Sequence, residues 1–281
     1  MDDDLDRLVE FVLANERLAV LTGAGCSTES GIPDYRSPGG LWTNHKPIYY
    51  AEFVRNETAR QRYWARSLAG WSSFQQADPN QAHYALAALE ARGRVCGLIT
   101  QNVDRLHQAA GSRDVLELHG HNDGVVCLDC GAEITRQQMQ SALLALNPDW
   151  TARPVAFAPD GDAQLDTASF DGFHLPACLH CGGLLKPNVV FFGESVPPSR
   201  VARAAEIVDE ADALLIVGSS LTVWSGYRFA RQAALAGKPI AIVNIGPTRA
   251  DPLAALKIEQ RVGAFLPMLL EQIGPPAVAR A

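Results

Sequence analysis

The chain lacks any cluster of basic residues, and acidic side chains outnumber basic ones. Of its 281 residues, 24 are Lys or Arg and 31 are Asp or Glu, which gives a net charge of -7. Proteins that bind the phosphates of nucleic acids need a clustered excess of positive charge. We therefore expect no nucleic-acid partner.

Long apolar runs and a targeting segment are also missing. No stretch approaches the roughly 20 apolar residues that are needed to cross a bilayer, so we expect no association with a membrane. The start, MDDDLDRLVEFVLA, is acidic where a signal or transit peptide would be basic. These absences predict a cytoplasmic protein, which we expect to be a monomer.

Cysteine is scarce, and four of the six cysteines fall in two CxxC units, CLDC and CLHC. Paired CxxC units in a chain without a secretion signal indicate a metal site rather than disulfides. Four thiolates favour a tetrahedral zinc ion, and because no fifth ligand is offered, the site would be closed and structural. A redox dithiol and two unrelated turns are the alternatives. The predicted ligands are Cys127, Cys130, Cys178 and Cys181.

Four apolar, β-branched runs predict the strands of a parallel sheet. They are RLAVLTG, RVCGLITQN, ADALLIVGSS and KPIAIVNIG, and amphipathic helical patterns separate them. This alternation is typical of an α/β protein with a Rossmann-like, doubly wound parallel sheet. The expected helices run from Asp3 to Asn15, Gln81 to Arg92, Ser199 to Glu210 and Ser225 to Leu235.

Two segments interrupt this alternation and predict a smaller inserted domain. Residues 35–74 are rich in aromatic residues and arginine, whereas residues 121–186 hold both CxxC units. We expect them to form one small domain with a helical insertion and a zinc module. The sheet domain would then comprise residues 1–34, 75–120 and 187–281.

Small and amide residues follow the expected strands, at the edge of the sheet where α/β proteins bind ligands. TGAGCSTESGIPDYRS supplies two glycines after the first strand, although Thr28 stands where a G-x-G-x-x-G would have its third glycine. Glycine there lets the backbone approach a phosphate, and a turn without a ligand is the alternative. After the second strand, TQNVDRLH adds two amides and an acid, and a helix cap by Asn102 or Asp104 would explain only one of them.

Three histidines are candidates for a general base. His119 precedes a glycine in LELHGHND, and a neutral imidazole at the edge of a cleft suits that task. His107 and His121 qualify on the same grounds. A structural role is the alternative for each of them.

In this order along the chain, these segments closely resemble the sirtuins, the NAD-dependent protein-lysine deacylases. IPDYRS, RYWARS, LKPNVVFFGE and NIGPTRADPLAALK are most similar to the class II, sirtuin 4-like branch. The resemblance implies an enzyme that uses NAD as a co-substrate and produces nicotinamide, O-acyl-ADP-ribose and free lysine. It also implies one structural zinc ion and an acyl-lysine protein or peptide bound as an added strand. A protein mono-ADP-ribosyltransferase and a non-catalytic NAD-sensing zinc module are the alternatives.

The resemblance further implies roles for single residues, with His119 as the general base and Asn102 as a second catalytic residue. The pyrophosphate would lie on Gly23, Ala24, Gly25 and Ser27, and a mobile cofactor loop would carry Pro33, Asp34 and Arg36. The nicotinamide ribose and carboxamide would contact Gln101, Asn102 and Asp104. The adenosine side would be bound by Gly218, Ser219, Ser220, Asn244, Ile245, Gly246 and Val262.

Tyr63 and Arg66 match the Tyr-x-x-Arg pair with which succinyl-removing sirtuins hold an acidic acyl chain. Residues three apart share one face of a helix, so this pair could meet one carboxylate. The resemblance then implies a broad or branched acidic acyl range of the glutaryl type. The alternative is a helix that presents its arginines to solvent while Tyr63 and Trp64 pack inside.

Overall fold

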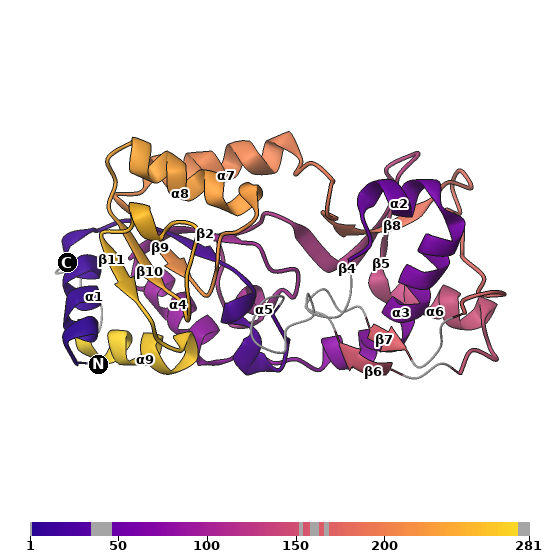
Figure 1. Ribbon diagram of the computed structural model, residues 1–281, viewed down its shortest axis with the longest axis horizontal. Coiled ribbons are helices and arrows are strands. Elements are labelled where there is room, and N and C mark those ends of the chain that lie inside the picture. The colour runs from indigo at the N-terminus through magenta and orange to yellow at the C-terminus, as the bar shows by residue number, and fades with distance from the viewer. Residues whose placement is uncertain (1, 35–46, 152–153, 158–162, 166–168, 275–281) are drawn as a thin grey trace, which may run out of the picture. The chain divides into compact units, whose positions relative to one another are not determined.

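The chain folds into two compact units, which are labelled by element in Figure 1. The computed structural model describes residues 2–34, 47–151, 154–157, 163–165 and 169–274. The first unit comprises residues 1–31, 78–118 and 196–281, and the second comprises residues 32–77 and 119–195.

A six-stranded parallel sheet forms the centre of the first unit, in the order β11-β10-β9-β1-β2-β3. The chain builds outward from β1 through β2 and β3 on one side, and then from β9 through β10 and β11 on the other. The strand order therefore reverses between β1 and β9, as in a doubly wound sheet. The strands are β1 (Leu18–Thr22), β2 (Val95–Thr100), β3 (Val115–Glu117), β9 (Ala213–Val217), β10 (Ile240–Val243) and β11 (Leu256–Ile258).

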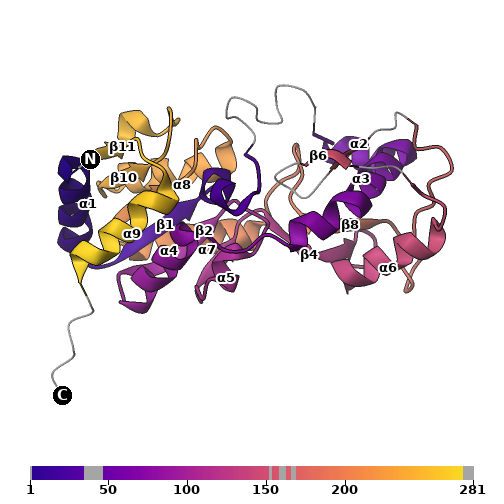
Figure 2. The same ribbon diagram turned by 90° about the horizontal axis from the view of Figure 1, so that it is seen from below.

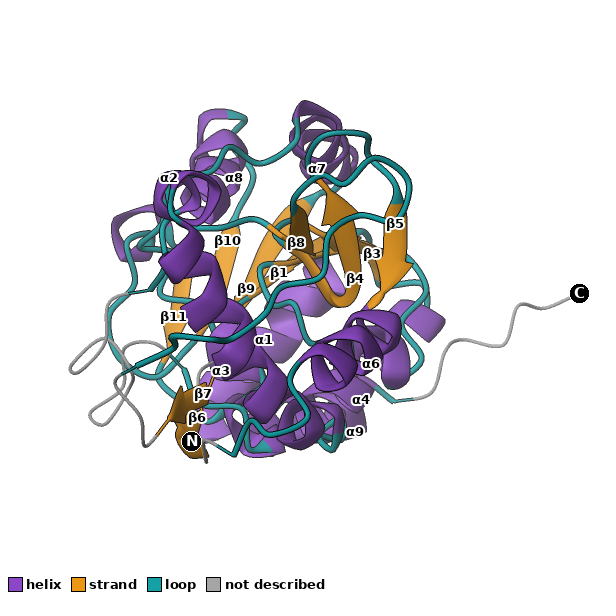
Figure 3. Ribbon diagram, turned by 90° about the vertical axis from the view of Figure 1, so that its right-hand side faces the viewer, coloured by secondary structure: helices purple, strands orange, loops and turns teal. Residues whose placement is uncertain are grey.

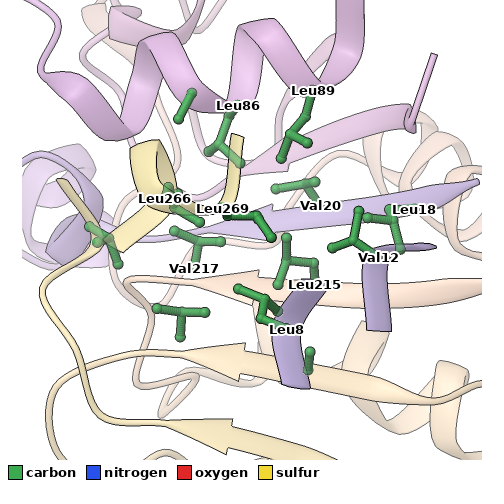
Figure 4. Close-up of a cluster of buried hydrophobic side chains, with 14 of the residues drawn as sticks. Leu8, Val12, Leu18, Val20, Leu86, Leu89, Leu215, Val217, Leu266 and Leu269 are labelled. Carbon is green, nitrogen blue, oxygen red and sulfur yellow. The ribbon is translucent and has the colours of Figure 1, made fainter. Parts of the chain in front are cut away.

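Alternate residues of β1 pack against helices on opposite faces of this sheet. Leu18 and Val20 contact one apolar cluster with α1 (Asp2–Ala14), α4 (Gln81–Ala91) and α9 (Val262–Ile273) (Figure 4). Figure 2 shows α4 and α9 beside this strand, and the two helices pack on each other. Both faces of β1 are thus buried, which explains why its sequence is an unbroken apolar run.

The opposite face is covered by α7 (Pro198–Glu210) and α8 (Trp224–Leu235), which lie together in Figure 1. Ala19 and Leu21 of β1 join a second apolar cluster with residues of these two helices. Two helical layers on one parallel sheet confirm the predicted fold class. No helix among the described residues is both long and apolar enough to cross a membrane.

The second unit combines a three-stranded antiparallel sheet, in the order β5-β4-β8, with helices and a short hairpin (Figure 3). Its strands are β4 (Gly120–Cys127), β5 (Glu133–Thr135) and β8 (Leu185–Val189), and the hairpin is β6 (Pro154–Phe157) with β7 (Ala163–Leu165). Its helices are α2 (Tyr50–Arg55), α3 (Glu57–Gln75) and α6 (Arg136–Leu146).

Arg136 anchors α6 on α3 from a buried position. Its guanidinium donates to the carbonyl and the hydroxyl of Ser67, both at 3.0 Å, and its Cζ lies 4.7 Å from the ring centre of Trp71. Burial lowers the pKa of Arg136 to about 10, so the side chain stays charged at neutral pH. The hydrogen bonds and the aromatic ring offset the cost of burying that charge.

Candidate functional site

The loop after β1 lies against the loop after β9. The Gly25 N–H donates to the Gly218 carbonyl at 2.9 Å, and a Cβ on Gly25 would lie 2.9 Å from the same oxygen. A Cβ on Gly23 would lie 2.7 Å from the side chain of Ser219. Gly218 has a φ of 59°, and a side chain there would strike the backbone of Cys26. These glycines are thus required by the close approach of two backbones, in addition to the close approach of a ligand that the sequence predicts.

Ser27 is the centre of a polar network that joins the loops after β1 and β2. Its hydroxyl donates to Asp104 Oδ2 at 2.6 Å and accepts from Asn102 Nδ2 at 2.9 Å. Asn102 Nδ2 also donates to the Gly23 carbonyl at 3.1 Å, and Asp104 Oδ1 accepts from the Leu106 N–H. Burial raises the pKa of Asp104, while the Ser27 hydrogen bond opposes that shift. The network fixes the orientation of the Asn102 amide.

Gln101 connects the same region to the loop after β9. Its Nε2 donates to Ser219 Oγ at 2.7 Å and to the Thr22 carbonyl at 3.1 Å. A Cβ on Gly226 would lie 2.5 Å from Gln101 Oε1, so the first turn of α8 packs on this amide. The carboxyl ends of β1, β2 and β9 therefore meet at the point where the strand order reverses, which is where such sheets bind ligands.

Two buried histidines lie against the end of β1 and the loop that follows it. One of them, His83, was not among the candidates from the sequence. His83 Nε2 lies 3.4 Å from Ser27 Oγ, and its Nδ1 accepts from the Asn80 N–H in a capping box at the start of α4. His107 Nε2 lies 3.0 Å from Thr22 Oγ1, and the two rings are 4.8 Å apart. Burial lowers the pKa of both residues, so both are neutral at pH 7. The signal that could have identified His83 is its position three residues after an N-cap asparagine.

We expect the free energy of unfolding to fall as the pH drops below the usual histidine pKa of 6.5, because burial lowers the pKa of His83 to about 4. Between these values the unfolded chain binds a proton that the folded chain excludes, so stability rises with pH there and is lost on acidification. The loss for His83 alone would reach about 3 kcal/mol. Thermal unfolding measured between about pH 4 and pH 7 tests this expectation.

His83→Asn should make this pH dependence less steep, because the replacement cannot take up a proton, while the buried His107 remains. His174→Gln is the matched control, since it also removes one histidine but at an exposed position in the second unit. A pH dependence that is equally steep in native and His83→Asn protein would contradict the assignment.

The residues predicted for the adenosine side lie after β10 and at the end of β9. Asn244 Nδ2 donates to the carbonyls of Ile245 at 2.8 Å and Gly246 at 3.2 Å, and Lys257 Nζ donates to the Gly246 carbonyl at 2.8 Å. Ile245 is 66% exposed, unusual for an aliphatic side chain next to a buried strand. Ser220 Oγ lies 3.1 Å from the Thr222 hydroxyl. The loop after β10 is therefore held by the Asn244 amide and by Lys257 of β11, and it presents the Ile245 side chain to solvent.

Val262 and Ala24 complete this half of the predicted set. Val262 is the first residue of α9, is 4% exposed and belongs to the apolar cluster under the sheet. Glu29 Oε1 accepts from the Gly263 N–H at 3.1 Å and so satisfies one free donor at this helix start. Ala24 begins a single 3-10 turn, and its carbonyl accepts from the Ser27 N–H.

The remaining predicted residues belong to the second unit. The His119 carbonyl accepts from the Val190 N–H at 2.8 Å, and the residue is half-buried. The next residue, Gly120, has a φ of 79°. Pro33 and Asp34 are half-buried. Arg36 lies outside the described residues.

The four cysteines of the CxxC units converge in the second unit. Their Sγ atoms all lie within 4.8 Å of one another, with 3.5 Å between Cys127 and Cys181 and 3.7 Å between Cys130 and Cys178. Four sulfurs about 2.3 Å from one zinc ion would be separated by about 3.8 Å, so the set fits a tetrahedral site. Hydrogen bonds from backbone N–H groups lower the pKa of Cys127 to about 7, whereas a hydrogen bond with Cys130 raises the pKa of Cys181 to about 12.

Two similar turns aim these thiols at one point. The Gly131 N–H donates to the Cys127 carbonyl and the Gly182 N–H to the Cys178 carbonyl, and both glycines have a φ above 70°. Cys127 ends β4 and pairs in register with Leu185 at the start of β8. The pairing of β4 with β8 thus brings the two turns together, and the cluster fits a structural zinc ion.

Comparison with known proteins gives consistent matches. Residues 23–225 match the model of the Sir2 family. The chain is 56% identical over 263 residues to NAD-dependent protein deacetylase 2 of Bradyrhizobium diazoefficiens, covering 94% of this chain and 96% of that protein. It is 49% identical over 274 residues to NAD-dependent protein deacylase Sirt4 of Drosophila melanogaster, covering 96% and 88%.

Solved structures agree with these matches over nearly the whole chain. One described as "Structural Basis for the Mechanism and Regulation of Sir2 Enzymes" has a TM-score of 0.76 and 35% identity, covering 97% of this chain and 98% of that one. A second, described as "Sir2-p53 peptide-NAD+", has a TM-score of 0.76 and 31% identity, covering 95% and 98%.

Proposed function

Because the chain belongs to the Sir2 family, we propose that it is an NAD-dependent protein-lysine deacylase. The observation that carries this proposal is a polar network at the point where the strand order of the sheet reverses. It consists of Ser27, Asn102, Asp104 and Gln101. A turn without a ligand would not need two amides, a hydroxyl and a partly buried carboxyl at the ends of three neighbouring strands.

Asn102 would act on the co-substrate. Its Nδ2 donates both hydrogens, to the Gly23 carbonyl and to Ser27 Oγ, so its Oδ1 points away from these partners. That oxygen would accept a hydrogen bond from a ribose hydroxyl or from the attacking water. Bound NAD would supply the nicotinamide leaving group and the ribose that receives the acyl group.

Other residues would bind and orient rather than react. The loop from Gly23 to Ser27 would hold the pyrophosphate with backbone N–H groups, and the loops after β9 and β10 would hold the adenosine. His119 would take the proton of a ribose hydroxyl, as a neutral imidazole can. The zinc ion would hold the second unit together and take no part in the reaction, because its four thiolates leave no open position.

Incubation of the native protein with NAD and an acetyl-lysine peptide tests the proposal. We expect nicotinamide, O-acetyl-ADP-ribose and free lysine in equal amounts, and a large loss of all three in Asn102→Ala protein. Asn15→Ala is the matched control, because the Asn15 amide only donates to the Phe11 carbonyl in α1. Nicotinamide release with ADP-ribose attached to protein would instead identify a mono-ADP-ribosyltransferase. Binding of NAD without any turnover would identify a non-catalytic sensor.

We also expect a preference for acidic acyl groups of the glutaryl type over acetyl. Tyr63 is 5% exposed, with its ring centre 5.5 Å from that of Phe53 and 5.2 Å from that of Phe191, and Arg66 follows one turn later on α3. A charge-assisted hydrogen bond from Arg66 would favour an acidic chain by about 10- to 100-fold. The measurement is kcat/KM for acetyl-, succinyl-, glutaryl- and branched dicarboxylic acyl-lysine peptides.

Arg66→Ala should remove this preference, and Arg62→Ala is the control on the same helix. Arg62 pairs with Glu52 at 2.8 Å and so belongs to the contact between α2 and α3. If acetyl-lysine is the best substrate and Arg66→Ala leaves the ranking unchanged, the hypothesis that Arg66 binds an acidic acyl chain is wrong. The burial of Tyr63 and Trp64 would then be explained by packing alone.

The protein substrate would bind as an extended peptide, and we further propose a cytoplasmic monomer with no nucleic-acid or membrane partner. The acidic net charge of -7 supports the absence of a nucleic-acid partner. The six free cysteines, four of them gathered for a metal, support a reducing compartment.

A further inference from the structure

Four side chains, three on α8 and one in the loop after β10, form a cluster at the surface, which we call the arginine–aromatic cluster. It consists of Trp224, Tyr227, Arg231 and Arg249. The Arg249 Cζ lies 4.2 Å from the ring centre of Tyr227 and 5.6 Å from that of Trp224, and the Arg231 Cζ lies 6.0 Å from the Trp224 ring. Trp224 is 46% exposed, although tryptophan is usually well buried.

This cluster is positively charged and has no carboxylate of its own. The sequence contains no Asp or Glu between Asp212 and Asp251. Asp251 accepts from the Thr248 hydroxyl and N–H and lies 3.6 Å from Lys257, so it is already engaged. Within the part of the chain that the structure describes, neither guanidinium of the cluster has an ion-pair partner. On a chain with a net charge of -7, this is an unpaired positive site.

The cluster is joined directly to residues of the proposed cofactor site. The Arg249 N–H donates to the Ser220 carbonyl at 2.9 Å, and its guanidinium donates to the Thr222 carbonyl at 3.3 Å. In the same first turn of α8, the buried Gly226 packs on the Gln101 amide. A ligand on the cluster would therefore lie beside the loops that are proposed to hold NAD.

We propose that the arginine–aromatic cluster binds an acidic side chain of the substrate protein close to the acyl-lysine, an inference that rests on the proposed deacylase function. A glutamate or aspartate has the matching chemistry: its carboxylate would pair with a guanidinium of the cluster while its methylene groups lie on the exposed Trp224 ring. A free phosphate would use the charges but not the exposed ring. The cluster is thus a specificity site for sequences rich in acidic residues around the modified lysine.

The test compares pairs of acyl-lysine peptides that share one acyl group and differ only by Glu or Gln at positions flanking the lysine. Scanning one position at a time on both sides locates the residue that is recognised. We expect kcat/KM to be about 5-fold higher for Glu than for Gln at the responsive position, the size expected of exposed ion pairs. The ratio should fall as salt is raised, because salt screens exposed charges.

The double variant Arg231→Gln, Arg249→Gln should bring this ratio close to one, and Trp224→Ala should reduce it. Arg17→Gln is the control for loss of positive charge: it removes one charge just before β1, beside Glu210, and should keep the ratio. Equal rates for Glu and Gln peptides in native protein, or a ratio that survives in the double variant, would overturn the inference while leaving the deacylase function intact. A dimer that forms in native protein and is lost in the double variant would also overturn it, by assigning the surface to a second copy. Failure to deacylate any peptide would instead contradict the proposed function.

Discussion

Replacing Cys127 by serine should release the zinc ion and unfold the second unit. Cys127 ends β4, and its sulfur lies 3.5 Å from that of Cys181 in the other turn, so the metal joins segments far apart in the sequence. Structural zinc binding contributes on the order of 10 kcal/mol at neutral pH, which is comparable to the whole free energy of unfolding of a typical domain. We expect metal analysis to give one zinc per chain for native protein and far less for Cys127→Ser.

Cys96→Ser is the matched control for this experiment. Cys96 lies in β2, where its sulfur donates to the Leu18 carbonyl, and it is outside the four-cysteine cluster. The variant should retain zinc and the native circular dichroism. Native protein with clearly less than one zinc per chain, or a Cys127→Ser variant that stays as resistant to proteolysis as the control, would contradict the structural role.

The sheet could be predicted from the sequence because its central strands are buried on both faces. The run ADALLIVGSS contains β9, and all five residues of that strand are buried. The start of α8 could be predicted less exactly than the strands. The helix begins at Trp224, and its N-cap residue, Val223, has no side chain that could cap it. The sequence predicted a start at Ser225, one residue after the observed start.

Spacing predicted the four cysteine ligands, since each CxxC unit is a local turn. The support of the phosphate loop could not be predicted in the same way, because Ser27 and His83 are brought together only when α4 packs on the sheet. Likewise, only the structure shows that Gly25 approaches the backbone of Gly218. Contacts between segments distant in the sequence leave no pattern in either segment alone. This also explains why the arginine–aromatic cluster was not anticipated.

His119→Ala should greatly slow deacylation while NAD still binds. Ser27 and Gln101, which are proposed to hold NAD, belong to the first unit and hydrogen bond to Asp104 and Ser219 of the same unit, whereas His119 belongs to the second unit. Removing the imidazole therefore leaves the binding network unchanged but removes the base. The expected loss in rate is about 10²- to 10⁴-fold. Release of nicotinamide under saturating NAD and calorimetric binding of NAD give the two readouts.

His121→Gln separates this role from that of the neighbouring histidine in β4. The two imidazoles are close in sequence, but His121 packs beside Gly124, where a Cβ would lie 3.0 Å from its ring, as expected of a side chain held for structure. We expect His121→Gln to deacylate within a few-fold of native protein. Undiminished turnover in His119→Ala would show that His119 is not the base, and a loss confined to His121→Gln would assign that role to His121. A loss of NAD binding in His119→Ala would contradict the division of roles between the two units.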